Sequence, residues 1–396
     1  MEIKKAILEG KVISKTRGKI EKYIGELARK YKYAHGPIQK NKIFAMTFDS
    51  SYNCNISYII DEIVKRDLNV DIVLVSNSKG KVGNIKRMPA CVRTVKRGSI
   101  EMFEEQATAK LWLDNALNCV WFGLPKKEDQ IYINTWHGSM GIKRLSGNDT
   151  WLWRAGRCKD MTDYVISNSR FEERVYEHTF WKDVPVLRYG HARNDIFFNE
   201  EEKENIRLRV REELGLEPDT KILLYAPTFR DDGDTSCFDL DYERIRAKMD
   251  EKYGGNWVIA VRFHNKNKSV SSKIIFDEHI INGTKYRNMQ DFMIAADAGI
   301  TDYSSWAYDF ILLNKPLFLY IPDVEKYDNQ RGFYYSIETT PFLKARNNDE
   351  LSEAVDNFDE GSYSADVKSF LRRRGCYEKG NSAVRTVDKI EELMGL

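Results

Sequence analysis

The sequence lacks the features that mark secreted, metal-binding and membrane-spanning proteins. Its 396 residues include six cysteines with no CxxC pair and no metal-ligand spacing, so we expect reduced thiols and a cytoplasmic protein. No apolar run approaches the ~18 residues that cross a bilayer, and the first residues lack the apolar segment of a secretory signal. The formal net charge is only +2, so no nucleic-acid partner is expected.

Charge is unevenly distributed along the chain. Residues 1–40 hold eleven Lys and Arg against four Glu, a segment of roughly +7. We interpret this leader as a segment that lies on an anionic membrane surface. A solvated helix or a disordered arm would have the same composition, and both alternatives stay open.

The rest of the chain alternates strand-like and helix-like segments. The first half has expected strands at 42–48, 71–76, 130–136, 163–169 and 184–190, and expected helices at 56–66, 100–116 and 170–180. After a charged helix at 199–216, the second half has expected strands at 221–229, 256–264, 299–302 and 316–322, and expected helices at 288–298 and 304–314. This alternation predicts an α/β protein with two doubly wound parallel sheets, over 41–200 and 201–380, followed by an amphipathic helix over 381–396.

Ligands of such sheets bind at the carboxyl ends of the strands, where this sequence places polar and cationic residues. In the first half these are His137, Gly138, His191, Arg193 and Asn194, and in the second half they are Thr228, Arg262, His264, Thr301, Asp302, Ser304 and Ser305. Three of the six histidines fall at strand ends. Their convergence at strand ends is stronger evidence for ligand sites than any single motif.

The segment GITDYSSW indicates a phosphate site, because a strand runs directly into a helix through hydroxyl side chains. Ser304 or Ser305 is expected to cap that helix, whose free amides and positive dipole end attract anions. A cap without a ligand is the alternative. Arg262 and His264 on a neighbouring strand end favour the ligand, since they could hold a diphosphate and stabilise its leaving charge.

His137 follows the strand QIYINTW and is our candidate general base. A neutral imidazole is a suitable base near neutral pH, and Gly138 permits a ligand to approach the backbone. Lys143 and Arg144 could attract an anion. The alternative is a buried histidine whose hydrogen bonds all go to the backbone.

The acidic segment RDDGDTSCFDLD at 230–241 resembles a metal-binding triplet. Its spacing does not fit a Ca²⁺ loop, so we expect a polar, solvated loop. No cofactor is expected to be required, and the sequence does not indicate a site for Mg²⁺.

Taken in order, several segments resemble the CDP-glycerol glycerophosphotransferase family of teichoic-acid and capsule polymerases and primases. They are ATAKLWLDNA, QIYINTWHG, ISNSRFEE, GHARND, LLYAPTFRDD, VRFH, DFMIAADAGITDYSSWAYDFILLNKPLFLY, YDNQRGFYYSIE and GNSAVR. The chain departs from the family after WHG, where Ser139-Met140-Gly141-Ile142-Lys143 replaces the common Thr-Pro-Leu-Lys, and GHARND replaces the usual GYPRND. The membrane-targeting extension of larger members is expected to be absent or reduced to the leader.

The resemblance implies a GT-B fold, in which two Rossmann-like domains face each other across a cleft and the C-terminal helix packs back on the first domain. It also implies a CDP-glycerol or CDP-ribitol donor in the second domain, with His137 as the base. The expected donor-binding residues are Thr228, Arg262, His264, Thr301, Asp302, Ser304, Ser305 and Arg331. The expected acceptor-binding residues are Gly138, Lys143, Arg144, His191, Arg193 and Asn194. The acceptor would be a lipid-linked or polymeric hydroxyl at the inner face of a bacterial membrane. A hexosyltransferase that uses a UDP- or GDP-sugar, and a non-catalytic protein that binds anionic membranes or polymers, are the alternatives.

Overall fold

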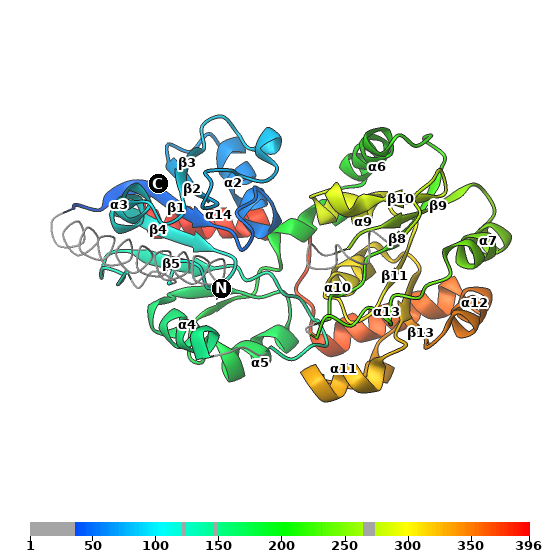
Figure 1. Cartoon of the computed structure of the whole chain (residues 1–396). Coiled ribbons are helices and arrows are strands. Elements are labelled where there is room, and N and C mark those ends of the chain that lie inside the picture. The colour runs from blue at the N-terminus through cyan, green and yellow to red at the C-terminus, as the bar shows by residue number, and fades with distance from the viewer. Residues whose placement is uncertain (1–35, 121–123, 146–148, 231, 264–273) are drawn as a thin grey trace, which may run out of the picture.

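The computed structural model describes residues 36–120, 124–145, 149–230, 232–263 and 274–396, so most of the predicted leader lies outside the described residues. These residues form two parallel β-sheets, one in each of two domains that lie side by side (Figure 1). This arrangement confirms the predicted GT-B type architecture.

The first sheet has seven strands in the order β3-β2-β1-β4-β5-β6-β7. Its strands are β1 (Gln39–Met46), β2 (Asp71–Ser76), β3 (Arg93–Lys96), β4 (Ala109–Asp114), β5 (Ile131–Asn134), β6 (Tyr164–Ile166) and β7 (Val186–Leu187). Both faces of β1 are buried: Ile43 and Ala45 join one hydrophobic cluster, and Phe44 and Met46 join another. Apolar residues at consecutive positions are what a parallel strand covered on both faces requires.

The second sheet has six strands in the order β10-β9-β8-β11-β12-β13. Its strands are β8 (Lys221–Tyr225), β9 (Trp257–Val261), β10 (Ile280–Asn282), β11 (Ala298–Thr301), β12 (Leu317–Tyr320) and β13 (Leu343–Ala345). In each sheet the strand order reverses at a central pair, β1 and β4 in the first sheet and β8 and β11 in the second. The polar loops that follow these strands therefore lie together at the carboxyl edge of the sheet.

Helices cover the faces of both sheets (Figure 1). They are α2 (Cys54–Lys65), α3 (Ile100–Thr108), α4 (Asp149–Met161), α5 (Arg170–Thr179), α6 (Glu200–Leu214), α7 (Tyr242–Tyr253), α9 (Met289–Ala295), α10 (Trp306–Phe310), α11 (Val324–Arg331), α12 (Asn348–Asp356), α13 (Glu360–Arg374) and α14 (Ser382–Met394).

The last helix, α14, returns to the first domain, as the resemblance implied. Val387 and Ile390 are fully buried in the cluster that lines one face of the first sheet. Arg66, which caps the carboxyl end of α2, bonds to Asp388 at 2.7 Å and to Glu391 at 2.5 Å. The C-terminal helix is therefore part of the first domain's core.

One predicted helix is wrong over half its length. The segment 100–116 is helical only to Thr108, and Ala109–Asp114 forms β4 between β1 and β5. Its apolar residues fit a helical period, but pairing with two neighbouring strands outweighs that local preference. The sequence prediction also missed β3, α4, α7, β10, β13 and α11 to α13.

The packing of α14 in the core can be tested by replacing a buried valine and an exposed valine of that helix, each by alanine. Val387→Ala should destabilise the first domain by roughly 1.5–3 kcal/mol, because a fully buried side chain loses its contacts. Val384, 39% exposed, is the matched control, and Val384→Ala should change little. Urea unfolding followed by circular dichroism measures both, and equal effects would show that α14 is not packed in the core.

Candidate functional site

A cavity of about 190 Å³ lies between the two domains, at the carboxyl ends of both sheets. The first domain contributes the loop after β5 and one face of α5, and the second domain contributes Ser305, Arg331 and Tyr334. A Cβ built on Gly141 would lie 3.4 Å from the Cβ of Ser305, so the two domains touch here. The cavity therefore brings together predicted residues of both halves: His137, Gly138, Lys143, Arg144, Ser305 and Arg331.

The loop after β5 is joined to the second domain by main-chain hydrogen bonds. The amide of Arg144 donates to the carbonyl of Gly332 at 3.0 Å, and the amide of Tyr334 donates to the carbonyl of Ile142 at 2.8 Å. The Nε of Arg144 also donates to the carbonyl of Phe333 at 2.9 Å. Arg144 was predicted to attract the acceptor, and in the structure its Nε serves this contact between the domains.

The chain turns sharply at Trp136, directly before His137. Trp136 has a left-handed backbone, with φ of 51°, which is uncommon for a bulky residue and must be held by its surroundings. Its ring packs against Phe180 and Trp181, and the side-chain amide of Asn55 donates to its carbonyl at 3.0 Å. The turn places His137 in the cavity rather than on the sheet.

His137 is oriented by a hydrogen bond of 2.5 Å between its Nδ1 and the main-chain carbonyl of Asn115. A carbonyl can only accept, so Nδ1 carries the proton and Nε2 keeps its lone pair. Burial lowers the pKa of His137 to about 4, even though the bond to Asn115 favours the charged form. The imidazole is therefore neutral at neutral pH, with Nε2 available as a base.

Two neighbours of His137 were not identified from the sequence. Phe48, which follows β1, is 47% exposed and stacks on the imidazole at a centroid distance of 4.9 Å. Asn115 follows β4, in the segment predicted as helix. Both residues lie just after a strand, and this position could have identified them. For Asn115 it could be recognised only once Ala109–Asp114 was known to form β4 beside β1.

Three residues predicted to contact the acceptor, His191, Arg193 and Asn194, lie in the interior of the structure. All three are buried, with exposed fractions of 0%, 4% and 0%. Nε2 of His191 lies 3.2 Å from the Glu172 carboxylate. The side-chain amide of Asn194 donates to Asp309 at 3.1 Å and to Glu378 at 2.9 Å. These residues lie behind the cavity and support it.

Arg193 connects the His137 loop with the second domain. Its guanidinium donates to Asp309 of α10 at 2.9 and 3.0 Å, and to the carbonyl of Gly138 at 2.5 Å. Both charged side chains of the pair are 5% exposed. A buried pair of this kind fixes geometry, because neither charge can be left unpartnered.

Two carboxylates nearby have shifted pKa values of opposite direction. Burial raises the pKa of Glu378 to about 7, against the favourable effects of His191 and Asn194. Burial acts in the same direction on Glu172, but His191 and the amide of Asn168 outweigh it and hold its pKa below the usual value. His191 thus lies between one carboxylate that stays ionised and another that is easily protonated.

On the donor side, the predicted residues Thr301 and Asp302 are buried and make hydrogen bonds within the protein. Thr301 is fully buried and donates its hydroxyl to the carbonyl of Ala226 at 2.9 Å. Asp302 is 3% exposed and accepts bonds from the amide of Thr228 at 2.9 Å and from Arg230 at 2.8 Å. Both residues shape the loops after β8 and β11, and neither presents a polar atom to the cleft.

Two other predicted donor residues, Thr228 and Arg262, lie in the loops after β8 and β9. The Thr228 hydroxyl is buried and bonds to no other described residue. Arg262 is half-buried, its Nε donates to the carbonyl of Tyr286 at 3.3 Å, and burial lowers its pKa despite the opposing charge of Asp49. His264, the remaining predicted residue, lies outside the described residues.

The predicted serine cap is only partly correct. Ser305 occupies the N-cap position of α10, but its side chain makes no capping hydrogen bond. The helix is also shorter than predicted, because it ends at Phe310 and continues as the 3₁₀ turn Ile311–Leu313. The Ser305 side chain lines the cavity that contains His137.

In the part of the chain that the structure describes, no group of three His, Cys, Asp or Glu side chains could hold a metal ion. In the acidic segment that was predicted to be a polar loop, two aspartates form ion pairs with Lys326. The Lys326 Nζ lies 3.0 Å from Asp232 and 2.5 Å from Asp234. Across the described ranges, no helix has both the length and the apolar character needed to cross a bilayer.

Comparison with known proteins identifies relatives over the whole of both domains. The family model described as CDP-glycerol:poly(glycerophosphate) glycerophosphotransferase matches residues 29–392. Two structures of variants of the wall teichoic acid polymerase TagF superpose with TM-scores of 0.81 and 0.80, each at 26% identity. The first covers 99% of this chain and 98% of that chain, and the second, soaked with CDPG, covers 95% and 93%.

Among curated proteins, two teichoic acid poly(glycerol phosphate) polymerases are similar. The Staphylococcus epidermidis polymerase is 29% identical over 77% of this chain, and the Bacillus spizizenii polymerase is 28% identical over 77%. The chain spans 44% of the length of the first and 79% of the length of the second.

Arg193 offers a test of the supporting cluster. Arg193→Met should destabilise the protein by about 3–5 kcal/mol, since it leaves the Asp309 carboxylate buried without its partner. Arg188 is the control, because it also bonds to a glutamate but is 64% exposed, and Arg188→Met should change stability little. Equal unfolding midpoints of the two variants in urea would contradict the cross-domain role of Arg193.

Proposed function

This chain belongs to the CDP-glycerol:poly(glycerophosphate) glycerophosphotransferase family, and from that premise we propose that it transfers glycerol phosphate from CDP-glycerol to an acceptor hydroxyl and releases CMP. The observation that carries the proposal is the cavity in which His137, with a free Nε2, faces Ser305 and Arg331 of the other domain. A base on one side and anion-binding groups on the other are what phosphoryl-type transfer needs.

In the proposed reaction, the acceptor oxygen attacks the phosphorus that carries the glycerol. A new P–O bond forms, and the hydroxyl proton passes to Nε2 of His137. The anhydride P–O bond breaks, and its electron pair leaves on the phosphate of CMP. The proton on His137 is later returned to solvent, so the reaction consumes no other reagent.

The donor diphosphate is proposed to lie between the loops after β8, β9 and β11. Thr228 would donate its unpartnered hydroxyl, and Arg262 would bring positive charge to the oxygen on which charge grows. Ser305 and Arg331 would hold the glycerol-bearing phosphate opposite His137. The TagF structure soaked with CDPG supports a cytidine donor for this site.

The acceptor is proposed to be a polymeric or lipid-linked hydroxyl, reached from the inner face of a bacterial membrane. The teichoic acid polymerases among the relatives support a polyol phosphate chain as the acceptor. Attachment to the membrane surface would use the basic leader, and vesicle sedimentation with and without residues 1–35 tests that part separately.

Identification of the released nucleotide tests the proposed function. The purified chain is incubated with a synthetic lipid-linked glycerol phosphate acceptor and, in parallel, with CDP-glycerol, CDP-ribitol and UDP- or GDP-hexoses. We expect CMP from CDP-glycerol. Release of UDP or GDP would instead show a hexosyltransferase, and CMP from CDP-ribitol alone would replace glycerol with ribitol.

His137→Ala should reduce turnover at least ~100-fold, because the acceptor hydroxyl loses its base. Affinity for CDP, measured by calorimetry, should stay near that of the wild type, since the donor contacts lie in the other domain. His178, an exposed histidine of α5, is the control, and His178→Ala should keep full turnover. Wild-type turnover in His137→Ala would refute the assignment of the base.

A further inference from the structure

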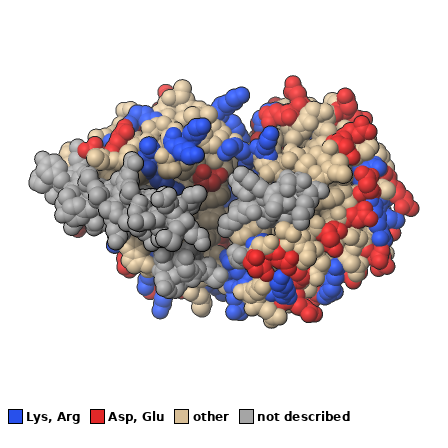
Figure 2. All heavy atoms as spheres, in the orientation of Figure 1, with Lys and Arg blue, Asp and Glu red and all other residues tan. Residues whose placement is uncertain are grey.

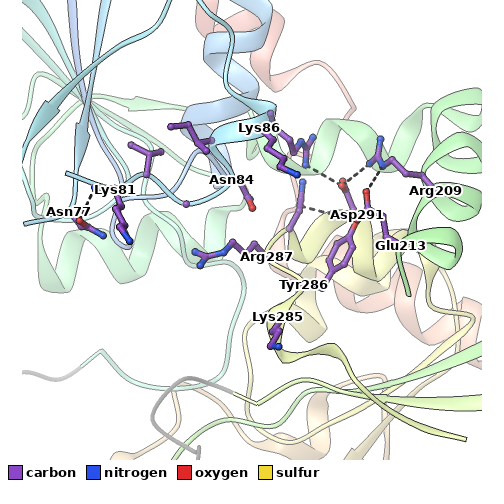
Figure 3. Close-up of a pocket in the computed structure, with 15 residues that line it drawn as sticks. Asn77, Lys81, Asn84, Lys86, Arg209, Glu213, Lys285, Tyr286, Arg287 and Asp291 are labelled. Carbon is purple, nitrogen blue, oxygen red and sulfur yellow. Dashed lines mark hydrogen bonds and ion pairs between the residues drawn. The ribbon is translucent and has the colours of Figure 1, made fainter. Parts of the chain in front are cut away.

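A second, larger cavity of about 660 Å³ opens between the domains, beside the segment after β2 and the segment after β10 (Figure 3). Six cationic side chains line it against two carboxylates, Glu213 and Asp291. The cations are Lys81, Lys86, Arg87, Arg209, Lys285 and Arg287. In Figure 2, Lys and Arg also gather on the face of the first domain that borders the second.

The two carboxylates are already used by two of the cations. Asp291 bonds to Arg87 at 3.1 Å and to Arg209 at 2.8 Å, which ties the domains together, and Glu213 lies 3.9 Å from Arg209. Among the described residues, no ion pair reaches Lys81, Lys86, Lys285 or Arg287. The cavity thus concentrates positive charge that the protein itself does not neutralise.

Specific features of the backbone at Gly83 and Asn84 shape the lining of the cavity. Gly83 lies where Arg287 crosses from the second domain, and a Cβ there would come within 2.7 Å of the Arg287 guanidinium. The amide of Gly83 donates to the carbonyl of Ser50 at 3.1 Å, which anchors the loop to the segment after β1. Neighbouring Asn84 has a left-handed backbone with φ of 55°.

Asn84 contributes a side-chain amide to the lining. Its side-chain nitrogen is buried and has no hydrogen-bond partner among the described residues, and Figure 3 shows its side-chain oxygen directed toward the cavity. A buried donor without a partner costs free energy unless a ligand or water accepts its proton. The four cations that form no ion pair within the described ranges are what suit this cavity to an anion that offers several oxygens.

The position of this cavity relative to His137 favours the acceptor chain as the source of the anion. In the first sheet, β2 and β5 are separated by β1 and β4, so their carboxyl ends lie roughly 14 Å apart. In the second sheet, β10 and β11 are separated by β9 and β8, which gives the same offset. Both cavities therefore lie along one cleft, with the cationic one to the side of the reacting centre.

We propose that this cationic cavity binds the phosphodiester backbone of the acceptor chain, behind the terminal hydroxyl that reacts at His137. The proposal rests on the function proposed above. The positive charge makes no distinction between repeat units, so a chain can move along it by one unit after each transfer. An acceptor with several phosphodiesters is then bound more tightly than one with a single phosphate.

Direct binding tests this without depending on turnover. The probe is a fluorescent glycerol phosphate oligomer with several phosphodiester units, and the method is fluorescence anisotropy at low and physiological salt. Lys81→Gln/Lys86→Gln and, from the other domain, Arg287→Gln should each weaken oligomer binding roughly tenfold, with a shallower salt dependence. Lys65→Gln/Lys79→Gln removes two exposed lysines outside the cavity and should leave binding unchanged.

The competing occupant is the nucleotide end of the donor. If either cavity variant weakens CDP binding as much as oligomer binding, the cavity belongs to the donor and the proposal is wrong. It is equally wrong if the wild type does not bind the oligomer, or if cavity and control variants bind it alike. A wild type that binds the oligomer through these cations but releases no CMP would overturn the proposed function and leave this site standing.

Discussion

The hydrogen bond between Nδ1 of His137 and the carbonyl of Asn115 is the interaction on which the proposed chemistry depends. It fixes the tautomer, and together with burial it leaves Nε2 unprotonated at neutral pH. The bond exists because β4 and β5 are adjacent and parallel, so that the residues after each strand meet. The left-handed turn at Trp136 then directs the imidazole into the cavity.

The cavity is completed only by contacts between the domains. Arg193 of the first domain reaches both Asp309 of the second domain and the carbonyl of Gly138, beside the base. Main-chain bonds join the loop after β5 to residues 332–334, and Asp291 binds arginines from both domains. The site is therefore a property of the closed pair of domains, and the anion-binding groups and the base are positioned by the same contacts.

The sequence allowed the two doubly wound halves and the position of His137 at a strand end to be predicted, because strand periodicity and the carboxyl-end rule are local. The return of the last helix was expected only from the family resemblance. It did not reveal β4, whose residues also fit a helix, and so the partner of His137 was missed. Arg193 and Asn194 were placed at the correct strand end, but their burial was not foreseen. Their partners, Asp309 and Glu378, lie 115 and 184 residues from Asn194 in the chain, and only the fold brings them together.

The pH dependence of kcat/KM reports the ionisation of the free enzyme and so shows whether His137 is neutral where the enzyme works. A neutral His137 whose pKa is lowered to about 4 is active as a base throughout the range above that pH. We predict that kcat/KM for acceptor transfer shows no loss due to His137 between pH 8 and about pH 5, where the donor and acceptor phosphodiesters keep their charge. A step near pH 7 would instead follow Glu378, whose pKa is raised to about 7. A loss of activity centred near the ordinary histidine pKa of ~6.5 that persists both in His178→Ala and in Glu378→Gln would contradict the assignment of His137 as a neutral base.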